Sequence, residues 1–295
     1  MRFIKEGTHI DFIGKRKLAL ALSLILIILG LVVFFKRGEE NFGVDFSGGT
    51  LIQLEFTRQV PIEDIRLSLK EIELGQSTIQ RFGEGKALII RTQADTEKIV
   101  LEKIRQDYPD NPFIHQRTEM VGPAVREDLR KRGLWALILA FLGIGIYVSM
   151  RFQFEYALGA VVALIHDILI TMGICAIAGR EITLPVLAGF LTLIGYSIND
   201  TIVVYDRIRE DLRLMRKENF GTIINTSINQ TLSRTALTTL TTLIAVVALF
   251  VWGGEVIHDF AFVLMIGIIT GTYSSIFVAS PLIVEWRRWR RKKSG

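Results

Sequence analysis

Six long apolar stretches most constrain what this chain can fold into. The first, residues 18–35, holds no charged side chain, and a helix needs roughly 20 such residues to cross a hydrocarbon core about 30 Å thick. Half of the 295 residues are hydrophobic, which excludes an ordinary soluble domain. We therefore predict an α-helical polytopic membrane protein with six transmembrane helices, at residues 18–35, 133–150, 156–178, 184–205, 231–252 and 260–284.

Basic residues set the expected orientation of these spans. They gather in residues 1–17, in the segment 206–230 and in the tail 285–295, whereas "GREIT" and "GGEVIHD" hold one arginine between them. Basic loops stay on the cytoplasmic side, so both termini are expected there. The first span is too long for a signal peptide and lacks a small-residue cleavage site. The net charge of +5 suits loops beside anionic lipid, and no nucleic-acid partner is expected.

Residues 36–132 are expected to form a soluble domain on the far side of the membrane, because their charges are mixed and nearly balanced. Alternating apolar residues predict strands, and helical spacing predicts helices. The predicted strands cover residues 50–56, 77–82, 86–92 and 113–119, and the predicted helices cover 61–74 and 95–108. The order βαββαβ is that of a small ferredoxin-like α+β domain, a scaffold that by itself implies no chemistry.

Asp200 lies within an otherwise apolar predicted span, where a charge costs about 3 kcal/mol on insertion scales. At about 1.5 Å per residue, Asp200 lies roughly 24 Å from the outer end of the fourth span, and Arg234 roughly 27 Å from that of the fifth. An acid and a base at matched depth on consecutive helices are candidates to pair. An intramembrane acid is by default a pathway or proton-relay residue.

A set of polar residues accompanies this predicted pair. On the fifth span they share one helical face, and the third and fourth spans add others near mid-membrane. The set comprises Ser227, Thr231, Thr238 and Thr241 on the fifth span, Tyr196, Ser197 and Asn199 on the fourth, and His166 and Asp167 on the third. Helix packing is the favoured role for a single threonine. His166 and Asp167 either satisfy each other or belong to the functional site.

An enzyme is disfavoured, and no catalytic residue, metal ligand or cofactor is expected. Intramembrane aspartyl catalysis needs two facing carboxylates, and Asp167 lies at a different depth from Asp200. The stretch "GVDFSGGT" lacks the Gly-Lys-Ser/Thr of a phosphate loop. Its residues are instead expected to form a turn that glycine permits, and they are Gly43, Asp45, Phe46, Gly48 and Gly49.

Six motifs carry a resemblance to a known family. They are "GVDFSGGT", "VGPAV", "HDI", "IGYSINDTIVVYDRIRE", "NQTLSRTALTT" and "GTYSSIFVASPL", and their order and spacing span nearly the whole chain. Together they resemble the SecD/SecF family of bacterial protein translocase subunits, within the resistance-nodulation-division (RND) superfamily. The resemblance implies six helices in the bacterial cytoplasmic (inner) membrane, with a periplasmic domain between the first two.

The resemblance also implies a function. It is that of an auxiliary Sec translocase subunit which, with a SecD partner, uses the proton motive force to promote protein export, late in translocation on the periplasmic side. Further implied partners are the SecYEG channel, YajC or YidC, the exported preprotein, protons and the lipid bilayer. In the family, the acid of "SINDT" and the arginine of "LSRT" belong to the proton-coupling site, and here these are Asp200 and Arg234.

Two alternatives stay open. A half-size RND-type exporter of small molecules or lipids would be expected to show a large, aromatic-lined apolar cleft in its soluble domain. A passive assembly scaffold would tolerate joint replacement of Asp200 and Arg234 by apolar residues of similar volume.

Overall fold

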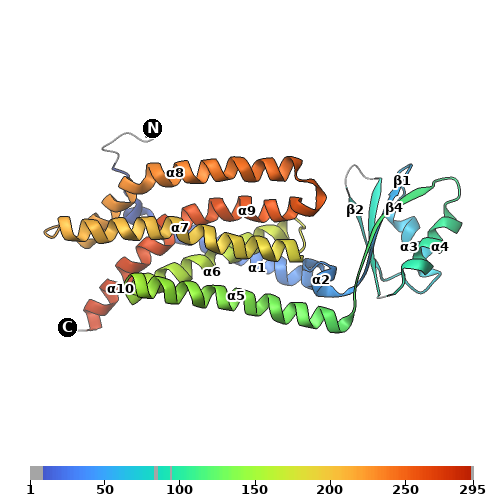
Figure 1. Cartoon of the computed structure of the whole chain (residues 1–295), viewed down its shortest axis with the longest axis horizontal. Helices are drawn as coiled ribbons and strands as arrows, with labels where there is room; N and C mark the ends of the chain where they lie inside the picture. Colours follow the sequence, from blue (N-terminus) through green and yellow to red (C-terminus); the bar gives the residue numbers. More distant parts are fainter. Residues whose placement is uncertain (1–8, 83–85, 94, 294–295) are drawn as a thin grey trace. The chain divides into compact units, whose positions relative to one another are not determined.

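The computed structural model describes residues 9–82, 86–93 and 95–293. The chain divides into two compact units (Figure 1). The first, the membrane unit, comprises Met1–Asn41 and Leu134–Gly295, and the second, the sheet unit, comprises Phe42–Gly133.

Six helical stretches of the described residues are long and apolar enough to cross a membrane. The predicted class of polytopic helical membrane protein is thereby confirmed. The first five stretches are α1 (Phe12–Arg37), which a 3-10 turn (Gly38–Asn41) follows, α5 (Pro123–Arg151), α6 (Phe154–Ile177), α7 (Leu184–Leu214) and α8 (Phe220–Trp252). The sixth joins α9 (Gly254–Ser274), a π-helical turn (Ser275–Ala279) and α10 (Ser280–Lys293).

Three of these spans form the interior of the membrane unit. Half or more of the most apolar window is buried in α6, α7 and the sixth span, against less than a fifth in α1, α5 and α8. The outer helices present large apolar side chains such as Leu24, Leu139 and Ile244 outward. Lipid is the environment that suits such surfaces, since lipid tails are as apolar as leucine.

The segment 206–230, expected to be mainly a loop, is mostly helical. Helix α7 continues to Leu214 and α8 begins at Phe220, where the side chain of Asn219 caps the helix. Contacts between the two helices explain this extension: Asp211, which is buried, accepts a hydrogen bond of 2.7 Å from Ser227 and pairs with Arg207 one turn earlier at 3.1 Å.

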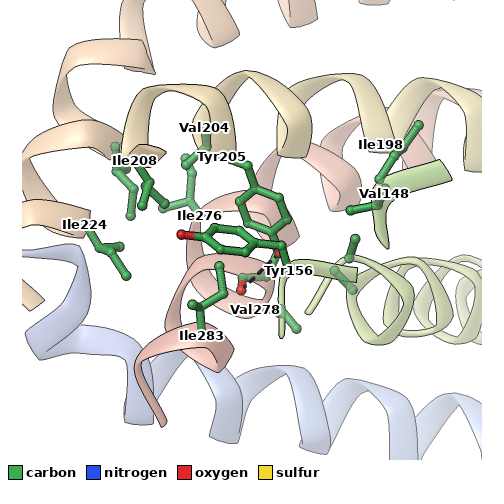
Figure 2. Packing of buried hydrophobic residues seen from close by; sticks show 14 of the residues in the cluster. Val148, Tyr156, Ile198, Val204, Tyr205, Ile208, Ile224, Ile276, Val278 and Ile283 are labelled. Carbon is green, nitrogen blue, oxygen red and sulfur yellow. Dashed lines mark hydrogen bonds between the residues drawn. The ribbon is translucent and has the colours of Figure 1, made fainter. Parts of the chain in front are cut away.

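The largest apolar cluster lies where α6, α7 and the sixth span meet (Figure 2). The ring of Tyr205 is fully buried and meets Tyr156 edge-on at a centroid distance of 4.9 Å. Its hydroxyl donates to the carbonyl of Ala279, in the π-helical turn, at 3.4 Å. A Cβ atom at Gly159 would come within 2.7 Å of that hydroxyl, so glycine is what admits the tyrosine here.

The sheet unit contains the predicted elements in the predicted order. The strands β1 (Gly49–Phe56), β2 (Thr78–Phe82), β3 (Ala87–Thr92) and β4 (Phe113–Val121) form one antiparallel sheet in the order β2-β3-β1-β4. Ile52, Leu54 and Phe56 project from one face of β1, as their alternation predicts, and are at most 1% exposed. They share a core with apolar residues of α3 (Ile62–Lys70) and α4 (Glu97–Asp107).

Candidate functional site

Asp200 lies on the buried face of α7 and is 3% exposed. Two hydroxyls lie beside its carboxylate, that of Thr238 on α8 and that of Thr272 on α9. Each hydroxyl also lies within hydrogen-bond distance of a carbonyl of its own helix, Thr238 of Thr235 and Thr272 of Ile268, at 2.9 Å each. The Oδ2 atom of Asp200 is buried without a hydrogen-bond partner.

Arg234 lies close enough to act electrostatically on Asp200, but the two side chains form no ion pair within 4.0 Å in the described part of the chain. Arg234 is exposed, as is Thr241 two turns along, whereas Ser227 and Thr231 on the same polar face are buried. The buried residues of α8 are Ile223, Ile224, Ser227, Ile228, Thr231, Thr235 and Val246. The polar face is therefore buried at its start, at Ser227 and Thr231, and exposed at Arg234 and Thr241.

The remaining predicted residues near Asp200 have separate environments. Asn199 is exposed, and the Tyr196 hydroxyl is buried without a partner, as is that of Thr235. Thr231 donates to the carbonyls of Ser227 and Ile228 in its own helix. Thr239, which the sequence did not single out, contacts Thr272 at 2.8 Å and joins α8 to α9.

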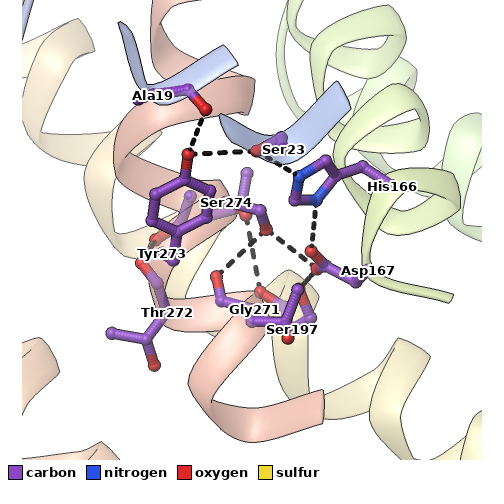
Figure 3. A network of polar contacts seen from close by, with 12 residues as sticks. Ala19, Ser23, His166, Asp167, Ser197, Gly271, Thr272, Tyr273 and Ser274 are labelled. Atoms are coloured by element: carbon purple, nitrogen blue, oxygen red, sulfur yellow. Dashed lines mark hydrogen bonds and ion pairs between the residues drawn. The ribbon is translucent and has the colours of Figure 1, made fainter. Parts of the chain in front are cut away.

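A second polar cluster surrounds Asp167, which is fully buried in α6 (Figure 3). Its Oδ2 atom accepts hydrogen bonds from Ser197 of α7 at 2.6 Å and from Ser274 of α9 at 2.8 Å. Its Oδ1 atom lies 3.0 Å from Nδ1 of His166, whose Nε2 atom lies 2.9 Å from the hydroxyl of Ser23 on α1. The carboxylate of Asp167 thus links α6 directly to α7 and α9, and it is linked to α1 through His166.

Tyr273 of α9 closes this cluster. Its hydroxyl donates to the carbonyl of Ala19 at 2.6 Å and lies 3.0 Å from the hydroxyl of Ser23. Its ring stacks on that of His166 at a centroid distance of 6.0 Å. Directly after Ser274 the chain enters the π-helical turn, a distortion that is frequent at functional sites.

Two glycines set the position of α1 in this cluster. A Cβ atom at Gly30 would come within 2.6 Å of Cα of Gly173, so α1 and α6 touch backbone to backbone there. Seven residues earlier on each helix stand Ser23 and His166, which are in contact. Seven residues make two helical turns, so the glycine crossing brings these two side chains together.

The sequence did not single out Ser23, Tyr273 or Ser274. Ser23 is the only polar side chain in residues 18–35, and that isolation was the available signal. Tyr273 and Ser274 lie within "GTYSSIFVASPL", which contributed only to the family resemblance.

The glycine motif lies in the sheet unit, before β1. Val44–Ser47 form one helical turn (α2), with Phe46 buried and Gly43 at its start. Arg126 donates to the carbonyl of Ser47 at 3.0 Å. Gly48 and Gly49 have φ values of 75° and 101°, which glycine adopts readily and other residues do not. Asp45, between Val44 and Phe46, is half-buried.

Carboxylates and an imidazole, which these two clusters contain, are groups that can bind a proton. Among the described residues no group of three or more His, Cys, Asp or Glu side chains could hold a metal ion. The two clusters each contain one buried carboxylate: that of Asp167 is hydrogen-bonded on both oxygens, and that of Asp200 has an unpartnered oxygen beside two hydroxyls.

The family models and the individual relatives that match this chain belong to one family. The C-terminal family model of the protein export membrane proteins SecD/SecF matches residues 100–289, and that of the SecD/SecF GG motif matches residues 41–60. The protein translocase subunit SecF of Desulfurispirillum indicum is 47% identical, over 95% of this chain and 92% of that protein. The same subunit of Calditerrivibrio nitroreducens is 42% identical over 99% of each chain.

A solved structure is also similar. The crystal structure of SecDF, a translocon-associated membrane protein from Thermus thermophilus, has a TM-score of 0.87 and 36% identity. The match covers 96% of this chain and 39% of the SecDF chain, so this chain spans about two fifths of that protein's length.

Proposed function

The chain belongs to the SecD/SecF family of protein export membrane proteins, and on that premise we propose that it couples the proton motive force to protein export. In this proposal it acts with a SecD partner as an auxiliary subunit of the Sec translocase, late in translocation. Asp200 binds and releases the coupling proton, and Arg234 and the neighbouring hydroxyls respond to its charge.

The unpartnered oxygen of Asp200 is the observation that carries this proposal. A buried charge without a hydrogen-bond partner is costly, and binding a proton removes that cost. Thr238 and Thr272 lie beside the carboxylate but donate to their own helices. Ionised Asp200 attracts these hydroxyls and Arg234, whereas protonated Asp200 releases them. The junction of α7, α8 and α9 then has two arrangements that proton binding can select between.

The available energy is sufficient for such a switch. One proton crossing a potential of 100 mV releases about 2.3 kcal/mol, which changes the ratio of two states roughly fiftyfold. A change of charge at Asp200 biases the packing of α7 against α8 and α9. Two of these helices, α7 and α9, also contribute Ser197 and Ser274 to the Asp167 cluster.

The SecD partnership is supported by the surface of α8 as well as by the SecDF similarity. Arg234 and Thr241 are exposed on a membrane-spanning helix, and an arginine that faces lipid is costly. A partner helix that covers this face removes the cost. The SecYEG channel, YajC or YidC and the exported preprotein are the further partners that we propose.

We assign the sheet unit to the ferredoxin-like class, since its βαββαβ order and antiparallel sheet suit that fold. We place it on the periplasmic side of the bacterial inner membrane, with both termini in the cytoplasm. Ion pairs support this orientation: Arg16–Glu285 and Arg287–Glu155, both at 2.8 Å, join the start of α1, the start of α6 and the basic α10. These elements therefore share one end of the membrane unit, the end rich in basic residues.

The test is translocation of a secreted precursor into inverted membrane vesicles that hold this chain and its SecD partner. We expect the two subunits to accelerate translocation when a proton gradient is present, and a protonophore to remove that acceleration. Vesicles with SecD alone are the control. Acceleration that survives the protonophore contradicts proton coupling, and no acceleration at all contradicts the role in export.

A further inference from the structure

The cluster around His166 contains more hydrogen-bond contacts than a neutral histidine beside an ionised aspartate can satisfy. Four contacts follow one another: Asp167 Oδ1 to His166 Nδ1, His166 Nε2 to Ser23 Oγ, Ser23 Oγ to Tyr273 Oη, and Tyr273 Oη to the carbonyl of Ala19. Each contact is 2.6–3.0 Å long and needs one hydrogen.

The end of this chain of contacts fixes its direction. A carbonyl only accepts, so Tyr273 must donate its single hydrogen to Ala19. Ser23 must then donate its hydrogen to Tyr273, and it can only accept from His166. Nε2 of His166 therefore carries a hydrogen, and the contact between Nδ1 and Asp167 needs another. The serine and the tyrosine supply two hydrogens, and the other two must be held by the histidine and the aspartate.

A neutral imidazole and a carboxylate together hold one such hydrogen, so the pair requires one more. We propose that His166 and Asp167 form a second proton-binding site, distinct from Asp200, that holds this additional proton between Nδ1 and Oδ1. The site is neutral overall, either as imidazolium with carboxylate or as imidazole with carboxylic acid. Its part in the export cycle rests on the proposed function, but proton binding at the pair does not.

Loss of this proton has a structural consequence. Only three hydrogens are then available for the four contacts. One of the contacts therefore has no hydrogen, and its two atoms, either two oxygens or a nitrogen and an oxygen, repel each other. The contacts at risk join α1 to α6 and α9 through Ser23. Deprotonation of the pair therefore loosens α1 from the rest of the membrane unit, while Ser197 and Ser274 still hold Asp167 to α7 and α9.

The other groups near His166 and Asp167 do not change the number of hydrogens available to the four contacts. Helix α1 presents the hydroxyl of Ser23 and α7 that of Ser197, and Tyr273 of α9 is the titratable neighbour. Asp200 of α7 lies beside Thr238 and Thr272. Among the charged residues of α10, Glu285 pairs with Arg16 and Arg287 with Glu155.

Nitrogen NMR of the full chain in lipid nanodiscs, with ¹⁵N-labelled histidine, tests the proposal independently of export. The chain has four histidines, and His166→Gln identifies the signal to follow. At neutral pH we expect Nε2 of His166 to carry a hydrogen, and a second hydrogen to lie between Nδ1 and Asp167. A bare Nε2, or no hydrogen at the Nδ1 contact, overturns the proposal.

A conservative variant provides the second measurement. Tyr273→Phe frees the hydrogen of Ser23 to be donated to Nε2, so the proton-depleted pair becomes fully hydrogen-bonded. Since a hydrogen bond to a charged group is worth about tenfold or more in an equilibrium, we expect the ratio of protonated to bare Nε2 at a fixed pH to fall about tenfold. Tyr147→Phe, on the outer face of α5, is the matched control and should leave the ratio unchanged. An unchanged ratio in Tyr273→Phe contradicts the hydrogen count.

Discussion

Replacing Asp200 by asparagine is expected to abolish the acceleration of export by the proton gradient and to leave the gradient-independent rate unchanged. Asparagine has nearly the same shape as aspartate and still forms hydrogen bonds, but its side-chain amide does not bind a proton near neutral pH. The bias of about 2.3 kcal/mol per proton at 100 mV is then unavailable to the α7–α8–α9 junction. The measurement is the translocation rate with and without a gradient, at equal abundance of the variant and the wild type.

Asp206→Asn is the matched control for this prediction. Asp206 lies on the same helix, but its side chain is 44% exposed and pairs with Arg151 at 2.8 Å, a setting in which an ion pair is worth at most about 1 kcal/mol. We expect the gradient to accelerate export through this variant as in the wild type. Full acceleration in Asp200→Asn, or equal loss in both variants, contradicts the assignment of Asp200.

The variant Gly30→Ala is expected to destabilise the folded membrane unit by about 1–3 kcal/mol, the usual cost of overpacking. The added Cβ atom would meet Cα of Gly173 at 2.6 Å. Because that neighbour is backbone rather than a flexible side chain, one helix must move away from the other. The movement separates Ser23 from His166 two turns along the same interface.

Gly143→Ala on α5 adds the same methyl group where nothing lies within 4 Å, and we expect it to change stability little. The free energy of unfolding can be measured in mixed micelles by titration with SDS, with tryptophan fluorescence as the signal. Equal stability of the two variants would contradict the close contact of α1 with α6.

The local patterns in this sequence predicted the elements well. Long, mostly apolar runs predicted the six spans, and the alternation of Ile52, Leu54 and Phe56 predicted a strand with one buried face, because both signals depend only on neighbouring residues. The segment 206–230 was less predictable: its charges suggested a loop, but the contact of Asp211 with Ser227 is made only once α7 and α8 pack together.

Residue counting along each helix suggested that Asp200 and Arg234 lie near one another, but it could not predict how the helices are rotated. Counting residues placed Asp200 and Arg234 at one level, and the structure shows why level alone is insufficient: α8 turns Thr235 inward and leaves Arg234 exposed. The cluster of Asp167 was harder still to foresee, because Ser23 and Tyr273 are single hydroxyl groups on distant helices. The glycine crossing at Gly30 and Gly173 that brings Ser23 to His166 gives no periodic signal of its own.

Proton flux during translocation tests the central claim most directly. Vesicles that contain this chain, its SecD partner and the translocation channel can be loaded with a pH-sensitive dye, and proton movement down an imposed gradient recorded before and after a precursor is added. The account predicts that the precursor increases proton flux through the wild type and not through Asp200→Asn. Equal flux through both, with the precursor still translocated, would show that export is not driven by a proton at Asp200.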